Sequence, residues 1–190
     1  MSKISIRPST TLYPMSVALV TCGTGEGANI ITLAWVGNLC SDPFTIGIGV
    51  RPHRYSHGLI KETGEFVVNI PTVEQLGIAD HCGTVSGRDV DKWAACGLTP
   101  QSASVVKAPL IAQCPINLEC QVIQTISLGV HHLFIGKVVA AHVDEALLDE
   151  KGKIDYSKIK PFIYWGGDYW ELGKWLGTYG YSEKQPGKAR

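Results

Sequence analysis

Phe44–Ser56 reads FTIGIGVRPHRYS, a β-strand pattern that runs directly into a pair of arginines. Large apolar residues alternate with small ones from Phe44 to Val50, so one face of the strand is apolar and the other, at Gly47 and Gly49, is bare. A glycine inside a strand often marks the close approach of a ligand or of a second backbone. The stretch therefore predicts a flat strand face beside a cluster of cations.

The guanidinium groups of Arg51 and Arg54 and the hydroxyl of Ser56 form a compact set of donors for a phosphate. Arginine gives planar, bidentate recognition of a dianion, and a hydroxyl can bind the remaining oxygen. Beside a bare strand face, this set indicates a phosphorylated, planar ligand. A plainer interpretation also fits: the arginines lie on a surface loop, and the glycines mark the corner of a barrel.

The composition is typical of one domain with a sizeable core. The chain has 190 residues, with 17 basic and 17 acidic side chains and a formal net charge of zero. A general nucleic-acid or membrane-surface binder would show a basic excess, and no apolar run approaches the length of a bilayer span. The N-terminal residues lack the apolar region of a signal peptide. We therefore expect a cytoplasmic protein with no nucleic-acid and no membrane partner.

The cysteines show neither the spacing of a disulfide framework nor that of a metal site. There is no C-x-x-C pair among the six cysteines, and His131-His132 has no further ligands at regular spacing. Cys114 and Cys120 alternate with apolar residues, which predicts that both lie on the buried face of one strand. We expect no metal site.

Short strands separated by turn signals make up most of the chain, which predicts a mainly β fold with a few helices. The expected strands cover residues 16–22, 28–36, 44–50, 65–70, 113–125, 131–143 and 162–165. The expected helices cover residues 55–62, 73–80, with Thr72 as the N-cap, and 90–95. Regularly spaced strands with few helices predict a closed or partly closed barrel. We expect one domain over residues 1–182 and a polar tail over 183–190.

Gly23–Ala28, GTGEGA, matches the dinucleotide fingerprint G-x-G-x-x-A only formally. That motif needs a helix after it, because the helix N-terminus binds the pyrophosphate. Here the strand pattern NIITL of residues 29–33 follows. We therefore expect neither a Rossmann site nor, without the required lysine, a P-loop.

Short segments from about Tyr13 to Tyr181 stand in an order typical of one family. The first segments are the opening hairpin at 17–35, LCSDPF at 39–44, the arginine stretch at 51–57 and the strand at 64–69. DKW at 91–93, GL at 97–98, LEC at 118–120 and GVHHLFIG at 129–136 follow. In this ordered set the chain resembles the flavin reductase-like, FMN-binding split-barrel proteins, and among them the flavoredoxin-type members. The resemblance implies an FMN-binding split β-barrel.

The resemblance also implies a set of cofactor-binding residues. The residues expected to contact the polar edge of the flavin, largely through backbone groups, are Asn29, Ile30, Ile31 and Thr32. The residues expected to bind the phosphate are Arg51, Arg54 and Ser56. Lys92 would lie near the flavin, where a cation favours the reduced, anionic form. Without the resemblance, these residues also fit ordinary strand positions and, for Lys92, a solvated helix charge.

His131 stands where the family places a histidine on the nicotinamide side, so the resemblance implies a catalytic role for it. The preceding aspartate of the family pattern is Val130 here, so the carboxylate that would orient the ring is missing from that place. His131 also alternates with Leu133 and Ile135, which fits a barrel histidine with its hydrogen bonds satisfied. Both interpretations stay open.

The implied activity is hydride transfer from NAD(P)H to the flavin, followed by electron transfer to an acceptor. FMN is expected rather than FAD, because the arginine set suits a terminal phosphate and no adenosine fingerprint remains. Two alternatives are a flavoredoxin-like electron-transfer flavoprotein that serves a redox protein partner, and a non-catalytic flavin-binding protein. The aromatic-rich segment 162–175 predicts a homodimer with the cofactor near the interface.

Overall fold

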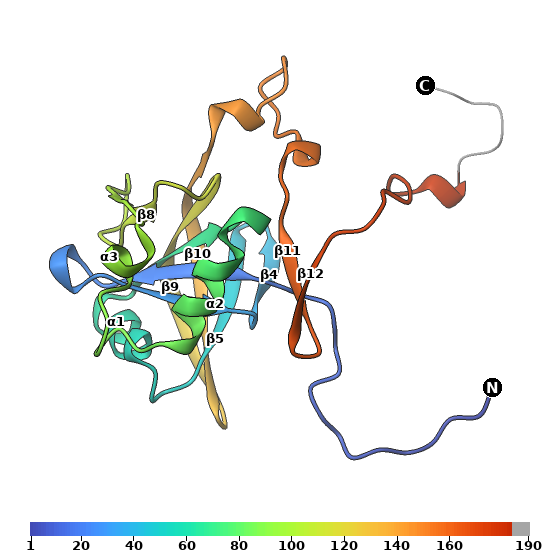
Figure 1. Cartoon of the computed structure of the whole chain (residues 1–190), viewed down its shortest axis with the longest axis horizontal. Coiled ribbons are helices and arrows are strands. Elements are labelled where there is room, and N and C mark those ends of the chain that lie inside the picture. The colour runs from blue at the N-terminus through green and yellow to red at the C-terminus, as the bar shows by residue number, and fades with distance from the viewer. Residues whose placement is uncertain (184–190) are drawn as a thin grey trace.

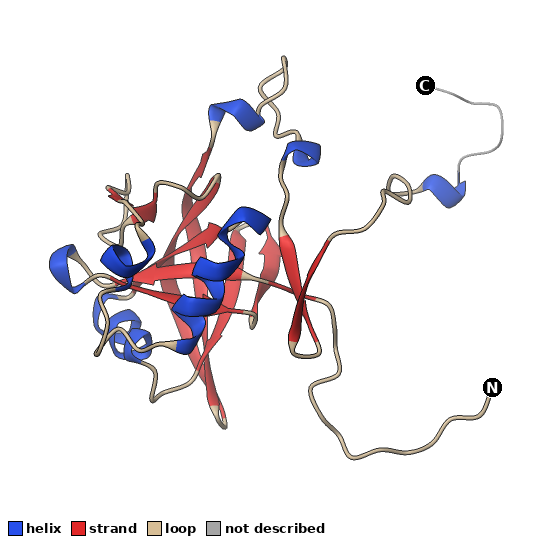
Figure 2. Cartoon of the chain, in the orientation of Figure 1, coloured by secondary structure: helices blue, strands red, loops and turns tan. Residues whose placement is uncertain are grey.

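The computed structural model describes residues 1–183, and an antiparallel seven-stranded sheet forms its centre (Figure 1). Its strands, in spatial order, are β3 (Asn29–Leu33), β2 (Ala18–Cys22), β6 (Glu65–Ile70), β9 (Ile116–Leu128), β10 (His131–Val143), β5 (Phe44–Val50) and β4 (Val36–Ser41). The sheet curls so that β3 contacts β5, and the Gly49 amide donates to the Trp35 carbonyl at 2.8 Å. The predicted mainly β fold is confirmed (Figure 2).

Smaller elements surround this sheet. A three-stranded sheet contains β1 (Met15–Ser16), β11 (Phe162–Trp165) and β12 (Asp168–Glu171), and a two-stranded sheet contains β7 (Pro100–Gln101) and β8 (Leu110–Ile111). The helices are α1 (Tyr55–Thr63), α2 (Leu76–Thr84) and α3 (Lys92–Cys96). Short 3₁₀ turns lie at Gly25–Gly27, Val73–Gln75, Glu145–Leu147, Tyr156–Lys158 and Tyr181–Glu183. No helix within residues 1–183 combines the length and the apolar character needed to span a bilayer.

The predicted strands 44–50, 65–70, 131–143 and 162–165 have the predicted bounds. The expected strand 28–36 is instead two strands, because the chain leaves β3 at Ala34 and enters β4 at Val36. β9 begins only at Ile116, so Cys114 lies in the preceding turn, and the prediction that it shares a strand with Cys120 is wrong. Most of the predicted tail, residues 184–190, lies outside the described residues.

The core has two main parts. Ile46, Ile48 and Val50 point into a cluster inside the barrel, which confirms the predicted apolar face of β5. A second cluster, which includes Leu19 of β2 and Ala79 of α2, packs α2, α3 and β11 against the outer face of β2 and β3. This second cluster holds α2 beside β3, where the cavity described below opens.

A buried carboxylate fixes the loop that follows β7. Glu119 of β9 has a fully buried side chain, and its oxygens accept hydrogen bonds from the amides of Ser104, Val105 and Val106 at 2.7–2.9 Å. The Ser104 hydroxyl donates to the same carboxylate at 2.7 Å, and Nε2 of His142 lies 2.6 Å from it. Burial opposes ionisation of Glu119, but these hydrogen bonds outweigh it and lower its pKa to about 2.

Candidate functional site

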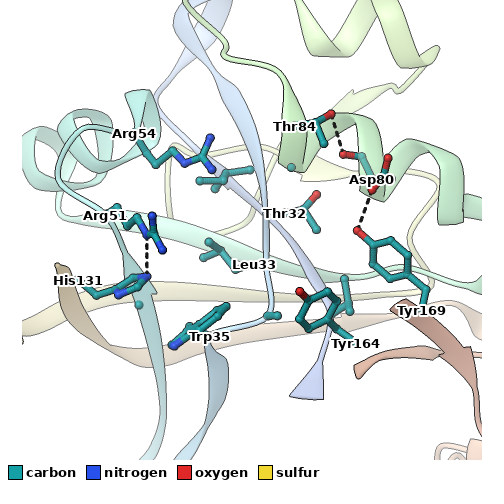
Figure 3. A pocket seen from close by; sticks show the side chains of 15 residues that line it. Thr32, Leu33, Trp35, Arg51, Arg54, Asp80, Thr84, His131, Tyr164 and Tyr169 are labelled. Carbon is teal, nitrogen blue, oxygen red and sulfur yellow. Dashed lines mark hydrogen bonds between the residues drawn. The ribbon is translucent and has the colours of Figure 1, made fainter. Parts of the chain in front are cut away.

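A cavity of about 340 Å³ opens where β3 and the start of the link to β4 meet β5, α2 and the β11–β12 hairpin (Figure 3). Its floor is apolar and includes Ile31, Leu33 and the bare backbone of Gly49. A Cβ added at Gly49 would lie 3.0 Å from the Cβ of Trp35, so a side chain there would crowd the wall of the cavity. The close neighbour of Gly49 is the side chain of Trp35, so the approach of a ligand to this face of β5 stays a prediction.

One wall of this cavity carries Arg51, His131 and Trp35 (Figure 3). Nε of Arg51 donates to Nε2 of His131 at 3.4 Å, and the indole of Trp35 stacks on the imidazole with ring centroids 5.4 Å apart. Burial, and then the charge of Arg51, lower the pKa of His131. The lowered pKa favours the neutral imidazole, and a neutral ring that accepts at Nε2 carries its proton on Nδ1.

The opposite wall is polar and internally hydrogen-bonded. The Tyr169 hydroxyl donates to the Asp80 carboxylate at 3.0 Å, and the Thr84 hydroxyl donates to the Asp80 carbonyl at 3.1 Å (Figure 3). Burial, and then the neighbouring Asp80, raise the pKa of Tyr169 to about 12, so this hydroxyl stays protonated. The hydroxyl of Thr32 donates to the Ala79 carbonyl at 2.5 Å, which ties β3 to α2.

A smaller pocket adjoins the large cavity and shares Ile31, Arg54 and Gly83 with it. We call it the anion pocket, and its other lining residues are Asn29, His53, Tyr55, Ser56, Cys82, Val85, Ser86, Gly87, Arg88 and Lys92. Arg88 lies over the ring of Tyr55, 5.3 Å from its centroid, and donates to the His53 carbonyl at 3.2 Å. The pocket therefore contains two guanidinium groups, which suit an anionic ligand.

Arg54 is the cation that links the two spaces. Its side chain is exposed and lines both the large cavity and the anion pocket. Within residues 1–183 its guanidinium group makes no hydrogen bond and no ion pair with another residue. A guanidinium group that faces a cavity and has no such partner can bind a carboxylate or a phosphate.

The loop between α2 and α3 passes close over Asn29. A Cβ added at Gly87 would lie 2.0 Å from Oδ1 of Asn29, so only a glycine permits this path. Nδ2 of Asn29 in turn donates to the hydroxyl of Ser56 at 2.8 Å, and both residues are buried. This hydrogen bond holds Asn29 at the place where Gly87 passes, in the loop of residues 85–91 that lines the anion pocket.

Lys92 is a buried cation with two carbonyl partners. Its Nζ donates to the carbonyls of Ile30 and Cys82, both at 2.7 Å. Burial lowers the pKa of Lys92, and the neighbouring Cys82 thiol opposes this shift. The ammonium therefore ties α3 to both β3 and α2, while the side chain lines the anion pocket.

The structure brings most of the predicted site residues to these two connected spaces. Those at the large cavity are Ile31, Thr32, Arg51, Arg54 and His131. Those at the anion pocket are Asn29, Ile31, Arg54, Ser56 and Lys92. Ile30 lies in neither space, because strand alternation turns its side chain into the core outside the barrel. Their roles toward a ligand stay predictions.

Sequence reasoning missed the residues that later segments contribute. Arg88 and Asp80 line the two spaces without any motif of their own. Tyr164 and Tyr169 belong to the aromatic-rich segment 162–175, which was expected near the cofactor, and both line the large cavity. The only signal for Arg88 was the position of Ser86-Gly87-Arg88 shortly before the DKW segment, which placed a glycine and a cation near Lys92. Trp35 also lines the cavity and is 39% exposed.

The profile of the flavin reductase-like domain family matches residues 10–173. The chain belongs to this flavin reductase-like family. Flavoredoxin of Desulfovibrio vulgaris is 32% identical, with a TM-score of 0.88 over 96% of this chain and 100% of that chain. Flavoredoxin from Methanosarcina acetivorans is also 32% identical, with a TM-score of 0.89 over 97% and 98%. An FMN-binding protein from Thermus thermophilus is 27% identical, with a TM-score of 0.79 over 94% and 99%.

The flavin reductase-like family assignment agrees with the resemblance drawn from the ordered sequence segments, and the predicted split-barrel fold is confirmed. All the residues that line the large cavity lie within the matched region, which ends two residues after β12. The flavin reductase-like domain therefore includes the whole wall formed by Tyr164 and Tyr169.

Proposed function

We propose that this flavin reductase-like protein binds FMN across the large cavity and the anion pocket, and that it works as an NAD(P)H-dependent oxidoreductase. One observation carries the proposal: the guanidinium of Arg54, which has no hydrogen-bond or ion-pair partner within residues 1–183, connects a partly apolar cavity to a pocket with a second arginine. FMN has the matching shape, a flat ring system that ends in a phosphate. The similarity to proteins named as flavoredoxins and as an FMN-binding protein supports it.

The residues present fit FMN better than a larger dinucleotide. The large cavity, at about 340 Å³, lies within the range of roughly 300–1,000 Å³ that is common for small-molecule sites. Its bare, apolar floor suits an isoalloxazine ring, and the guanidiniums of Arg54 and Arg88 suit a terminal phosphate. Among the residues that the structure describes, no glycine-rich turn leads into a helix N-terminus at the site, since Gly23–Gly27 leads into β3.

Within this proposal the protein binds and orients, and no side chain acts as a nucleophile. The chemistry supplied by FMN is hydride acceptance from a nicotinamide and release of the electrons to an acceptor. Arg54 and Arg88 would hold the phosphate, Arg51 would place positive charge beside the ring system, and Tyr169 would limit the access of water. Neutral His131, stacked on Trp35, would border the ring on the side of β10.

The first expected result concerns the cofactor and the electron donor. Purified protein loaded with flavin should be yellow, and heat should release FMN, as identified by chromatography. Rapid mixing of the oxidised holoprotein with NADH or NADPH under anaerobic conditions should bleach the flavin absorption within seconds. Release of FAD alone would contradict the cofactor assignment.

The electron-transfer alternative is favoured by the close similarity to two flavoredoxins along nearly the whole chain. A protein of this kind would accept electrons rapidly from a reduced ferredoxin-type partner and only slowly from either nicotinamide. The same rapid-mixing experiment, with dithionite-reduced ferredoxin as the second donor, distinguishes the two. A holoprotein that binds FMN but accepts electrons from none of these donors would be the non-catalytic flavin-binding protein.

We further propose a homodimer in which a second copy covers the open side of the cavity. The N-terminal segment and the segment that follows β12 extend away from the barrel (Figure 1). Residues from β12 onward expose large apolar side chains. Trp170 is 57% exposed, Trp175 79% and Leu176 91%. Exposed apolar side chains of this size are typical of an interface, and a two-fold dimer is the commonest arrangement that buries them.

Sedimentation velocity at low micromolar concentration tests this expectation. The full chain should sediment as a dimer, and truncation after Glu171 should shift it towards monomer and weaken FMN binding. A monomer that retains a full complement of FMN would contradict the dimer. The cytoplasmic location also stays a proposal, supported by six free cysteines, which are typical of a reducing compartment.

A further inference from the structure

Two thiols from different helices meet beside the anion pocket. Sγ of Cys82, in α2, lies 3.9 Å from Sγ of Cys96, in α3, and both cysteines are free. Cys82 is fully buried, whereas Cys96 is partly exposed. Cys82 also lines the anion pocket. Nothing in the proposed flavin chemistry uses either thiol.

We propose that Cys82 and Cys96 form a reversible disulfide that clamps the loop 85–91 over the anion pocket. The two cysteines bracket this loop, which contributes Ser86, Gly87 and Arg88 to the pocket lining. The sulfur atoms need to approach by only about 2 Å to reach bonding distance. The disulfide itself is independent of the proposed function, whereas its effect on FMN rests on that function.

The oxidant is a small disulfide such as glutathione disulfide. The thiolate of Cys96, the more accessible sulfur, attacks one sulfur of the oxidant, whose S–S bond breaks, and the departing thiolate takes up the proton that Cys96 lost. The thiolate of Cys82 then attacks the Cys96 sulfur in the mixed disulfide and releases the second thiol, which takes up the proton from Cys82. The protein loses two electrons and two protons, and the oxidant becomes two thiols.

The surroundings of Cys82 should make the second step, its attack on the mixed disulfide, slow. Burial, and then the neighbouring Cys96, raise the pKa of the Cys82 thiol to about 12, while the Lys92 ammonium works in the opposite direction. Once Cys96 is part of a mixed disulfide, its contribution is removed and the cation of Lys92 remains. The step that closes the intramolecular bond should therefore become faster as the pH is raised.

The existing contacts explain why a disulfide between Cys82 and Cys96 would affect the anion pocket. Lys92 already joins α3 to the carbonyl of Cys82, so the two helices meet at one point. Arg88 is held by the His53 carbonyl and the Tyr55 ring, both outside the loop. A covalent link between the loop ends would reduce the freedom of the loop to move Arg88 away, and preorganisation of this kind slows ligand release.

Titration of the apoprotein with glutathione disulfide tests the bond without any cofactor. We expect a loss of about 2 Da, corresponding to two hydrogen atoms, in intact mass measured after the excess oxidant is removed. Non-reducing peptide mapping should show a Cys82–Cys96 link, and dithiothreitol should reverse it. The closed loop should raise the melting temperature by roughly 5 °C.

Three variants make the assignment specific. Cys96→Ser, at a partly exposed position, should fold, retain Cys82 as a thiol and show no loss of mass. Cys40→Ser removes the exposed cysteine and should leave the link intact. Cys114→Ser removes the third thiol near Cys82 and should also leave it intact. A link between Cys82 and Cys114, or an adduct at Cys40 alone, would overturn the proposal.

The clamp itself is tested by the rate of FMN release. In the oxidised holoprotein, dissociation followed by the recovery of flavin fluorescence should be about threefold slower than in the reduced protein, and Cys96→Ser should show no difference. An unchanged rate in a protein that carries the mapped disulfide would overturn the clamp. Failure to bind FMN in either state would contradict the proposed function, while the bond between the cysteines would stand on the mass and mapping results.

Discussion

Replacing Glu119 by glutamine should lower the free energy of unfolding at pH 7 by roughly 3 kcal/mol, the scale that follows from a pKa of about 2 in place of 4.5. Glutamine has nearly the same shape, but its amide group would turn N–H donors towards backbone amides that now donate to the carboxylate. Val105 and Val106 both donate to the same oxygen, at 2.7 and 2.9 Å. Urea unfolding followed by circular dichroism measures the change.

The pH dependence identifies the carboxylate as the cause. Because the folded state lowers the pKa of Glu119, the unfolded state binds more protons between about pH 4.5 and pH 2. The stabilisation is therefore fully present above pH 4.5 and is lost as the pH falls towards 2. The stabilities of the native protein and of Glu119→Gln should converge over this range.

Glu65→Gln is the matched control. Glu65 also lies on a central strand, but within residues 1–183 its carboxylate accepts a single backbone amide, that of Lys107 at 2.8 Å. Its replacement should cost less than about 1 kcal/mol, the usual value of a single hydrogen bond. Equal losses in the two variants would show that the network around Glu119 adds nothing beyond one bond.

The strands of this chain could be predicted because the alternation of apolar and small residues in the sequence corresponds to the two faces of a strand. β5 has an apolar face in the core, as its sequence indicates, and its bounds are those predicted. Its other face is not bare, because the side chains of Leu39 and Leu133 cover it at Gly47. The break between β3 and β4 could not be predicted, because Ala34 and Trp35 continue the apolar pattern. The break is set by a distant contact, the hydrogen bond from Gly49 to the Trp35 carbonyl.

The site was only partly predictable, for the same reason. Arg51 and Arg54 stand close in sequence, so their pairing could be seen. Arg88 reaches the same pocket only because α2 and α3 fold back beside β3, and no local pattern reports that approach. Lys92 was expected near a flavin as a charge, but its two carbonyl partners come from β3 and α2, which tertiary packing brings together.

Replacing Arg54 by alanine should weaken FMN binding by roughly 1.5–3 kcal/mol, or about 10- to 150-fold in the dissociation constant, the scale of a charge-assisted hydrogen bond. Arg54 lines both spaces and has no hydrogen-bond or ion-pair partner in the described part of the chain, so the full interaction with a phosphate would be lost. Arg51 lines only the large cavity and already contacts His131, so Arg51→Ala should have the smaller effect. Quenching of flavin fluorescence on binding measures both.

Two further variants separate the effect of the bidentate guanidinium geometry from the effect of the positive charge. Arg54→Lys keeps the charge but loses bidentate geometry, so it should recover only part of the affinity. Lys137→Ala removes an exposed cation of β10 that lines neither space, and should change affinity by less than about twofold, since exposed charges interact weakly at a distance. The apoprotein should keep its stability in every case, because Arg51 and Arg54 are exposed. Unchanged FMN affinity in both alanine variants would instead establish the surface-loop interpretation of the arginine pair.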